Sequence, residues 1–302
     1  MACETSLPAP IEYLPFTDGP FRMAMGLLDL KAEHWIELDA RLPDQLALKE
    51  KLLRERHAEV FAARAGTETG GQETLELLAG HLAAHFPQVY ARDGTRMLNH
   101  ITQEALDLDS RARHPLEIAA RLVQEDLCLM AARADAFELS AACVCFPSRW
   151  KLSEKLGQPL RGIHAPVPFY DEKIGAATDR FMQLLSEEKP VWRLNWTLHD
   201  SPYLFAPSAA IQHANAAGEA AAAPAPALWL RVERQTLRRL PRCREILFTI
   251  RTYVQPLADF TTRPDVRARL AAAIRGLPPQ TAQYKSMAPL AADALAWLEH
   301  GR

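Results

Sequence analysis

The sequence predicts an α+β protein in which helices dominate the N-terminal half and an antiparallel sheet dominates the C-terminal half. Leucines recur at helical spacing before residue 135, whereas four later segments carry the partial alternation and apolar content of strands. One helical segment separates these strands, which favours antiparallel neighbours over a doubly wound sheet. With 302 residues the chain can bury a substantial core, and we treat residues 1–302 as one domain.

Three helices are predicted before the first long strand, over residues 44–63, 73–85 and 115–134. The second is the clearest, because Leu75, Leu78 and Leu82 form a stripe at helical spacing. Pro87 ends this helix, since the residue before a proline is disfavoured in the helical conformation.

The C-terminal half is predicted to hold the sheet. Its strands are expected at 137–146, 191–198, 227–233 and 245–254. A helix is expected at 171–188, and an Ala/Pro-rich insert at 206–226. A helical extension at 257–302 is expected to contain helices at 264–275 and 289–300. The insert has the low complexity of a loop without chemistry of its own.

The composition excludes several classes of partner. A net charge of -2 gives no reason to expect a nucleic-acid backbone or an anionic membrane as the main partner. We find no signal peptide in residues 1–16 and no apolar run long enough to span a bilayer. We therefore expect a soluble, cytoplasmic protein.

The five cysteines do not form a disulfide framework, because they are odd in number and scattered. Cys143 and Cys145 share one face of a predicted strand, but no second pair completes a tetrahedral metal site. His81 and His85 have the spacing of two metal ligands on one helix face, again without a third ligand. Inert thiols and a polar helix face are the favoured interpretations.

Common catalytic motifs are missing from the sequence. It has no G-x-G-x-x-G after a strand, no Walker loop, no H-E-x-x-H and no G-x-S-x-G. His164 is more informative, since Pro166 and Pro168 stiffen the extended chain expected around it. Such a histidine suits an axial ligand of haem iron, and the alternative is a loop histidine bonded to the backbone.

The segment Trp229 to Pro241 alternates charged with apolar residues before a basic, helix-like turn. Buried charges there would need each other, an anionic ligand or water as partners, because an isolated buried charge costs several kcal/mol. The named charges are Arg231, Glu233, Arg234 and Arg238. The alternative is a solvated strand edge.

A second strand carries a similar pattern. Alternation places Arg193 and Asn195 on one face and Trp192 and Trp196 on the other. Together with Arg231 and Arg251, Arg193 would present guanidinium groups to carboxylates, and cross-strand pairing with Glu233 or Glu245 is the alternative.

These segments resemble the haem-dependent oxidative N-demethylase alpha-subunit-like family. The resemblance rests on Glu125-Asp126-Leu127, Cys145 to Trp150, Leu156-Gly157, Ile163-His164 with Pro166-Val167-Pro168, Asn195-Trp196 and Arg231 to Pro241. It extends from about Phe16 to about Pro256 and so covers most of the chain.

The resemblance implies a PAS-like core that holds a b-type haem. It also implies oxygen activation, as in a monooxygenase, with oxidation of an N-methyl group of a small secondary amine resembling dimethylamine and release of formaldehyde. Electrons would come from NADPH through flavin and iron–sulfur centres on partner subunits. The chain itself shows no flavin or nicotinamide fingerprint and no cluster-spaced cysteines.

Within this resemblance, chemistry suggests a role for each candidate residue. His164 is the expected iron ligand, and Arg193, Arg231 and Arg234 are candidates for the haem propionates. Glu233 and Trp196 are the expected groups near the amine, as a carboxylate and an aromatic face for a cation. A thiolate of Cys143 or Cys145 is an alternative ligand. A non-catalytic haem sensor or carrier, and a haemless scaffold, are alternative functions.

Overall fold

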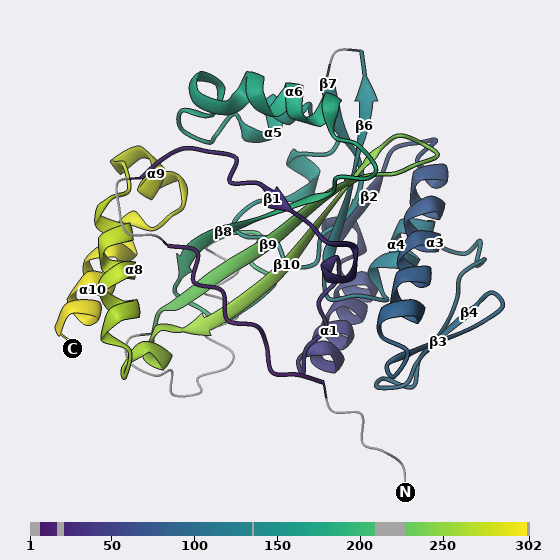
Figure 1. Cartoon of the computed structure of the whole chain (residues 1–302), viewed down its shortest axis with the longest axis horizontal. Helices are drawn as coiled ribbons and strands as arrows, with labels where there is room; N and C mark the ends of the chain where they lie inside the picture. The colour runs from purple at the N-terminus through teal and green to yellow at the C-terminus, as the bar shows by residue number, and fades with distance from the viewer. Residues whose placement is uncertain (1–6, 17–20, 135, 209–226, 301–302) are drawn as a thin grey trace, which may run out of the picture.

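The computed structural model describes residues 7–16, 21–134, 136–208 and 227–300, and its centre is an antiparallel sheet. Among these residues the sheet has the strand order β1-β8-β9-β10-β6-β7-β2 (Figure 1). The strands are β1 (Leu28–Asp29), β2 (Phe61–Ala63), β6 (Asp126–Arg133), β7 (Ala136–Cys143), β8 (Val191–His199), β9 (Trp229–Arg239) and β10 (Ile246–Pro256). A separate small sheet contains β3 (Tyr90–Asp93), β4 (Arg96–Asn99) and β5 (Ala105–Asp107).

The sheet has two chemically different faces, because side chains alternate along each strand. In the β8–β9 register Arg193 lies opposite Gln235 and Asn195 lies opposite Glu233, so these four side chains share what we call the Arg193 face. Trp192 and the residues in phase with it form the opposite, Trp192 face. The predicted alternation of Arg193 and Asn195 with the tryptophans is confirmed.

Most helices cover the Trp192 face. The helices are α1 (Leu42–Glu55), α2 (His57–Val60), α3 (Glu68–His85), α4 (Pro115–Ala120), α5 (Leu160–His164), α6 (Ala176–Leu184), α8 (Pro264–Arg275), α9 (Pro279–Tyr284) and α10 (Ala288–His300). Apolar residues of α1, α3 and α4 pack with β6 and β10, while α8 and α10 pack with β9 at the other end of this face. Figure 1 shows these two helical groups on either side of the long strands.

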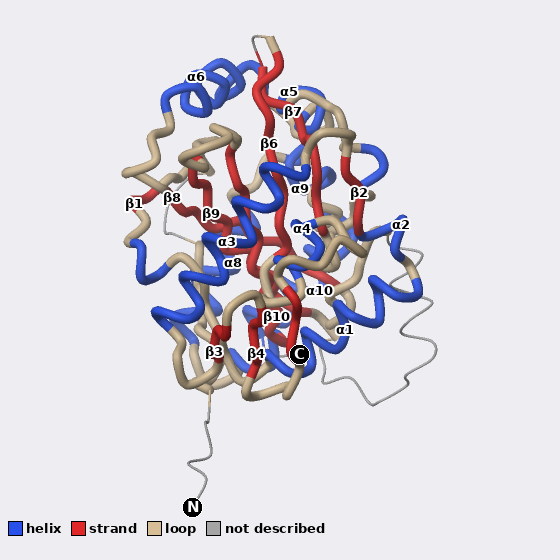
Figure 2. Tube along the Cα trace, turned by 90° about the vertical axis from the view of Figure 1, so that its right-hand side faces the viewer, coloured by secondary structure: helices blue, strands red, loops and turns tan. Residues whose placement is uncertain are grey.

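The Arg193 face is covered at one end by α5 and α6. Leu160 of α5 and Met182 of α6 pack on Cys128, Met130 and Ile246 of the sheet. Figure 2 shows α5 and α6 near the end of the molecule where β6 and β7 meet. This small core fixes the position of α5, whose last residue is His164.

Two predicted elements were wrong in type. The helix expected over 115–134 ends at Ala120, and β6 follows from Asp126, because its apolar run is buried between β7 and β10. A short buried apolar run gives no periodicity that separates strand from helix. The helix-like turn expected before Pro241 is also strand, since β9 pairs with β10 as far as Arg239.

The conformation expected around His164 was wrong as well. His164 is the last residue of α5, and Ala165 is still helical although Pro166 follows it. Tertiary packing of Leu160 outweighs the local preference of a residue before proline. The strands predicted in the C-terminal half and the helix at 264–275 are confirmed, and the α+β class with them.

Two further expectations concern the insert and membranes. Of the Ala/Pro-rich insert, residues 209–226 lie outside the described residues. In the parts of the chain that are described, no helix combines the length and apolarity needed to cross a bilayer.

Candidate functional site

His164 presents one ring nitrogen to its own helix and keeps the other available. Its Nδ1 lies 2.8 Å from the carbonyl oxygen of Leu160. A carbonyl can only accept a hydrogen bond, so Nδ1 carries the proton and the lone pair of the neutral ring lies on Nε2. Burial lowers the pKa of His164, and the positive charges of Lys155 and Arg193 lower it further. The ring therefore favours the neutral form, which can bind a metal.

Tyr170 fixes the plane of the His164 ring. The two rings are stacked with centroids 4.5 Å apart and an angle of 6° between their planes. Tyr170 is buried, at the end of the segment that leads into the π-helical turn η3 (Asp171–Gly175). The imidazole is thus held by a hydrogen bond in its plane and by a stacked ring on its face.

Arg193 lies within electrostatic range of His164 and has an unsatisfied guanidinium. Its Nε is buried without a hydrogen-bond partner among the described residues. Burial lowers the pKa of Arg193, whereas the nearby charge of Glu233 raises it. The cross-strand neighbour of Arg193 is Gln235, so the direct pairing with Glu233 considered from sequence is not formed.

Glu233 is held by two amides on the Arg193 face. Its Oε2 accepts hydrogen bonds from Gln235 Nε2 at 3.0 Å and from Asn195 Nδ2 at 3.4 Å. Asn195 lies directly opposite on β8. These two amides orient the carboxylate.

Lys285 joins this group from the C-terminal extension, and sequence reasoning did not find it. Its Nζ donates to Asn195 Oδ1 at 3.0 Å and to the carbonyl of Trp196 at 2.5 Å. The pKa of Lys285 is lowered to about 8, chiefly by burial, while the charge of Glu233 raises it and that of Arg193 lowers it. The residue follows α9 in a segment with no sequence pattern that marks it as part of a site.

We call Arg193, Asn195, Glu233, Gln235 and Lys285 the charged cluster. With Lys285 protonated it contains two cations and one carboxylate, so an added anion would balance the excess positive charge. His164 and Tyr170 lie at its border, since Arg193 acts electrostatically on His164. The cluster brings two predicted residues, Arg193 and Glu233, into one site close to a third, His164.

Arg231 has a different environment from Arg193. Its guanidinium is buried and donates to the carbonyls of Phe146 at 2.6 Å, Leu204 at 3.2 Å and Tyr203 at 3.4 Å. These bonds join β9 to two loops. Arg231 shares the Arg193 face, but most of its donors are already used by the backbone.

Arg234 lies on the opposite face of the sheet, away from the charged cluster. In the register it pairs with Leu194 and Arg251, which both belong to the Trp192 face. Its Nε lies 3.0 Å from Glu37 Oε1, and its terminal nitrogens donate to the carbonyls of Trp35 and His34. The grouping of Arg234 with Arg193 that the sequence suggested is therefore corrected, because Arg234 lies three positions after Arg231 along β9 and so points to the opposite face.

Trp196 is also separated from Glu233 by the sheet. Its ring belongs to the Trp192 face, where it packs edge-on against Phe16 at a centroid distance of 6.1 Å. Lys285 Nζ lies 5.5 Å from the centre of this ring and reaches around the edge of β8. The pairing of Trp196 with Glu233 in one pocket is corrected, and Asn195 takes the place beside the carboxylate.

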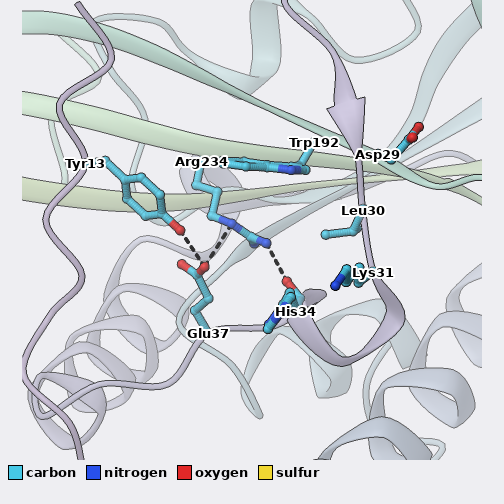
Figure 3. Close-up of a pocket in the computed structure, with 8 residues that line it drawn as sticks. All are labelled: Tyr13, Asp29, Leu30, Lys31, His34, Glu37, Trp192 and Arg234. Atoms are coloured by element: carbon cyan, nitrogen blue, oxygen red, sulfur yellow. Dashed lines mark hydrogen bonds and ion pairs between the residues drawn. The ribbon is translucent and has the colours of Figure 1, made fainter.

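A cavity of about 330 Å³ lies on the Trp192 face. Its lining residues are Tyr13, Asp29, Leu30, Lys31, His34, Glu37, Trp192 and Arg234 (Figure 3). Glu37 accepts from Tyr13 Oη at 2.6 Å and pairs with Arg234, while the Arg234 guanidinium carbon lies 5.3 Å from the centre of the Trp192 ring. Arg234 thus supports a wall of this cavity.

The alternative metal ligands are poorly placed. Cys143 and Cys145 are fully buried, and a hydrogen bond between them together with burial raises the pKa of Cys145 well above its usual value. No group of three or more potential ligands (His, Cys, Asp or Glu) is arranged for a metal ion within the described ranges. A single histidine that would hold a haem iron does not depend on such a group.

The fold and the site define an α+β protein with a cluster of charged residues on one face of an antiparallel sheet, next to a histidine whose Nε2 is not used by the bond to its own helix. A family model described as haem-dependent oxidative N-demethylase, alpha subunit-like, matches residues 26–295. The chain belongs to this family. The family name indicates haem dependence and a system with other subunits.

Proposed function

We propose that this chain is the haem-binding, oxygen-activating subunit of an oxidative N-demethylase. Its substrate class would be a small secondary amine resembling dimethylamine, with formaldehyde as a product. When bound, the haem would supply the oxidising chemistry. Electrons would arrive from NADPH through flavin and iron–sulfur centres on separate reductase partners.

The tautomer of His164 is the observation that carries this proposal. The hydrogen bond from Nδ1 to the Leu160 carbonyl leaves the lone pair on Nε2, which would be the ligating atom, as in many metal sites in which the second nitrogen bonds a backbone carbonyl. Stacking on Tyr170 limits rotation of the ring. Both features suit the axial ligand of a b-type haem iron.

The charged cluster fits the carboxylates of a haem. Arg193 has a buried, unsatisfied Nε and lies within electrostatic range of His164, so it is the preferred propionate partner. The Nε atoms of Arg231 and Arg234 are likewise buried without a hydrogen-bond partner among the described residues, but backbone carbonyls accept from their terminal nitrogens, so we propose that these two arginines support the sheet and its loops.

Glu233 is proposed to bind the amine. A small alkylamine is a cation near neutral pH, and the carboxylate is oriented by Asn195 and Gln235. The same carboxylate would accept the proton that the amine releases before oxidation. Lys285 would influence this proton transfer, because its ammonium donates a hydrogen bond to the same Asn195 side chain.

Absorption spectra of the purified protein supplied with haem would test the proposal. We would compare ferric, reduced and carbon-monoxide-bound forms of the wild type, His164→Ala and His100→Ala, the last being an exposed histidine as a matched control. Stoichiometric haem binding that is lost or spectrally shifted only in His164→Ala supports the assignment. Wild-type protein that binds no haem overturns it and favours the scaffold function.

Two further measurements separate the remaining alternatives. Cys145→Ser, but not His164→Ala, would alter the carbon-monoxide spectrum if a thiolate were the ligand. Amine-dependent formaldehyde release with a surrogate reductant separates the demethylase from a haem sensor or carrier. Glu233→Gln should lower this turnover while haem binding is kept.

A further inference from the structure

A second group of basic side chains lies on the Trp192 face, around the buried indole of Trp35. The guanidinium carbon of Arg238 lies 4.2 Å from the centre of the Trp35 ring. His81 packs edge-on against the same indole, with ring centroids 5.1 Å apart, and its ring lies 4.4 Å from that of His85. We call Trp35, His81, His85 and Arg238 the Trp35 cluster.

Three polar atoms of the Trp35 cluster are buried without a hydrogen-bond partner among the described residues. They are Trp35 Nε1, His81 Nε2 and Arg238 Nε. The indole and guanidinium nitrogens can only donate, and His81 Nε2 donates when it is protonated. Since buried polar groups are nearly always hydrogen-bonded, three unsatisfied nitrogens in one cluster suit a bound acceptor.

The neighbouring carboxylates do not supply that acceptor. Glu73 acts electrostatically on Arg238, but its oxygens accept from the backbone nitrogens of Arg242 at 2.7 Å and Cys243 at 2.8 Å. Glu33 is exposed to solvent, where its own backbone nitrogen and the charges of His34, Lys31 and His85 lower its pKa. The cluster therefore has basic groups in excess.

The charge of the Trp35 cluster selects the class of ligand. Burial, together with the positive charges of His85 and Arg238, lowers the pKa of His81 to about 4. A cation would add to this repulsion, whereas an anion would relieve it. Two histidines also fall short of the ligand number of a structural metal site.

We propose that the Trp35 cluster binds a small oxyanion, with Arg238 as its charged anchor and the Trp35 indole and His81 as further donors. Arg238 is partly exposed and His85 is exposed, so an oxyanion could reach the cluster from solvent. The site lies on the face opposite the charged cluster and does not depend on haem. A bound oxyanion would stabilise the protonated form of His81. The affinity of the cluster for the oxyanion should therefore rise as the pH falls.

Titration calorimetry of the full chain with sulfate tests this proposal, because sulfate keeps its charge between pH 5 and pH 8. We expect Arg238→Met to weaken binding at least about tenfold, consistent with the loss of one charge-assisted bond. The matched control Arg96→Met removes an exposed arginine of β4 and should leave binding unchanged. Circular dichroism confirms that each variant is folded.

A second variant and a second probe complete the test. His81→Gln keeps a side chain that can donate a hydrogen bond but cannot gain a charge, so it should bind sulfate with little dependence on pH. Binding of sulfate alone supports a tetrahedral oxyanion, and binding of acetate as well supports a class that includes carboxylates. Absence of binding, or equal binding by wild type and Arg238→Met, overturns the proposal.

Discussion

The titration of Lys285 gives a quantitative test of the charged cluster. Burial lowers its pKa from 10.5 to about 8. At pH 7 about 10% of such a lysine is neutral, against about 0.03% at the ordinary value. Between these two pKa values the unfolded chain binds more protons than the folded chain, so the free energy of unfolding rises with pH. Below pH 8 the buried ammonium costs about 3 kcal/mol.

Competitive acetylation at a series of pH values, read by mass spectrometry, measures this pKa as the midpoint of reactivity. Lys151, an exposed lysine, serves as the internal reference. Glu233 raises the pKa of Lys285 and Arg193 lowers it, so Glu233→Gln should move the midpoint down and Arg193→Gln should move it up. A wild-type midpoint near 10.5, or shifts of the same sign in the two variants, would refute the reasoning.

Two further predictions concern stability and are checked by urea denaturation. Gly71→Ala should destabilise by about 1–3 kcal/mol, because a Cβ there would lie 2.8 Å from His114 Cε1 and 3.0 Å from the backbone nitrogen of Leu116. Gly80→Ala, in the same helix and with open space around it, should instead stabilise by up to about 1 kcal/mol, and equal effects would contradict this packing. Arg251→Met should cost about 3–5 kcal/mol, since it leaves Asp39 buried without the guanidinium 2.6 Å away. An unchanged denaturation midpoint would show that this ion pair contributes nothing.

Local patterns in the sequence predicted much of the sheet. The alternation in β8 gave the correct face for Arg193, because side-chain direction in a strand follows directly from sequence. β6 was missed, since a strand buried on both sides has no alternation to reveal it. The two residues of β1 are too few to carry any pattern.

The candidate site could be predicted only in part for a similar reason. Arg193 and Glu233 lie on neighbouring strands, and their common face follows from register, which the sequence does not determine. Arg234 was grouped with Arg231 although it lies three positions further along β9, an odd offset that makes their side chains point to opposite faces. Lys285 reaches the cluster through tertiary packing of α9, for which no local signal exists.

The origin of Lys285 has a consequence for the order in which the site is completed during synthesis. A nascent chain that ended at Pro256 would already contain every strand of the large sheet, together with His164, Arg193 and Glu233. It would lack the ammonium that bonds Asn195 and the carbonyl of Trp196. The charge of the cluster would then be set last, after the ribosome has translated beyond α9.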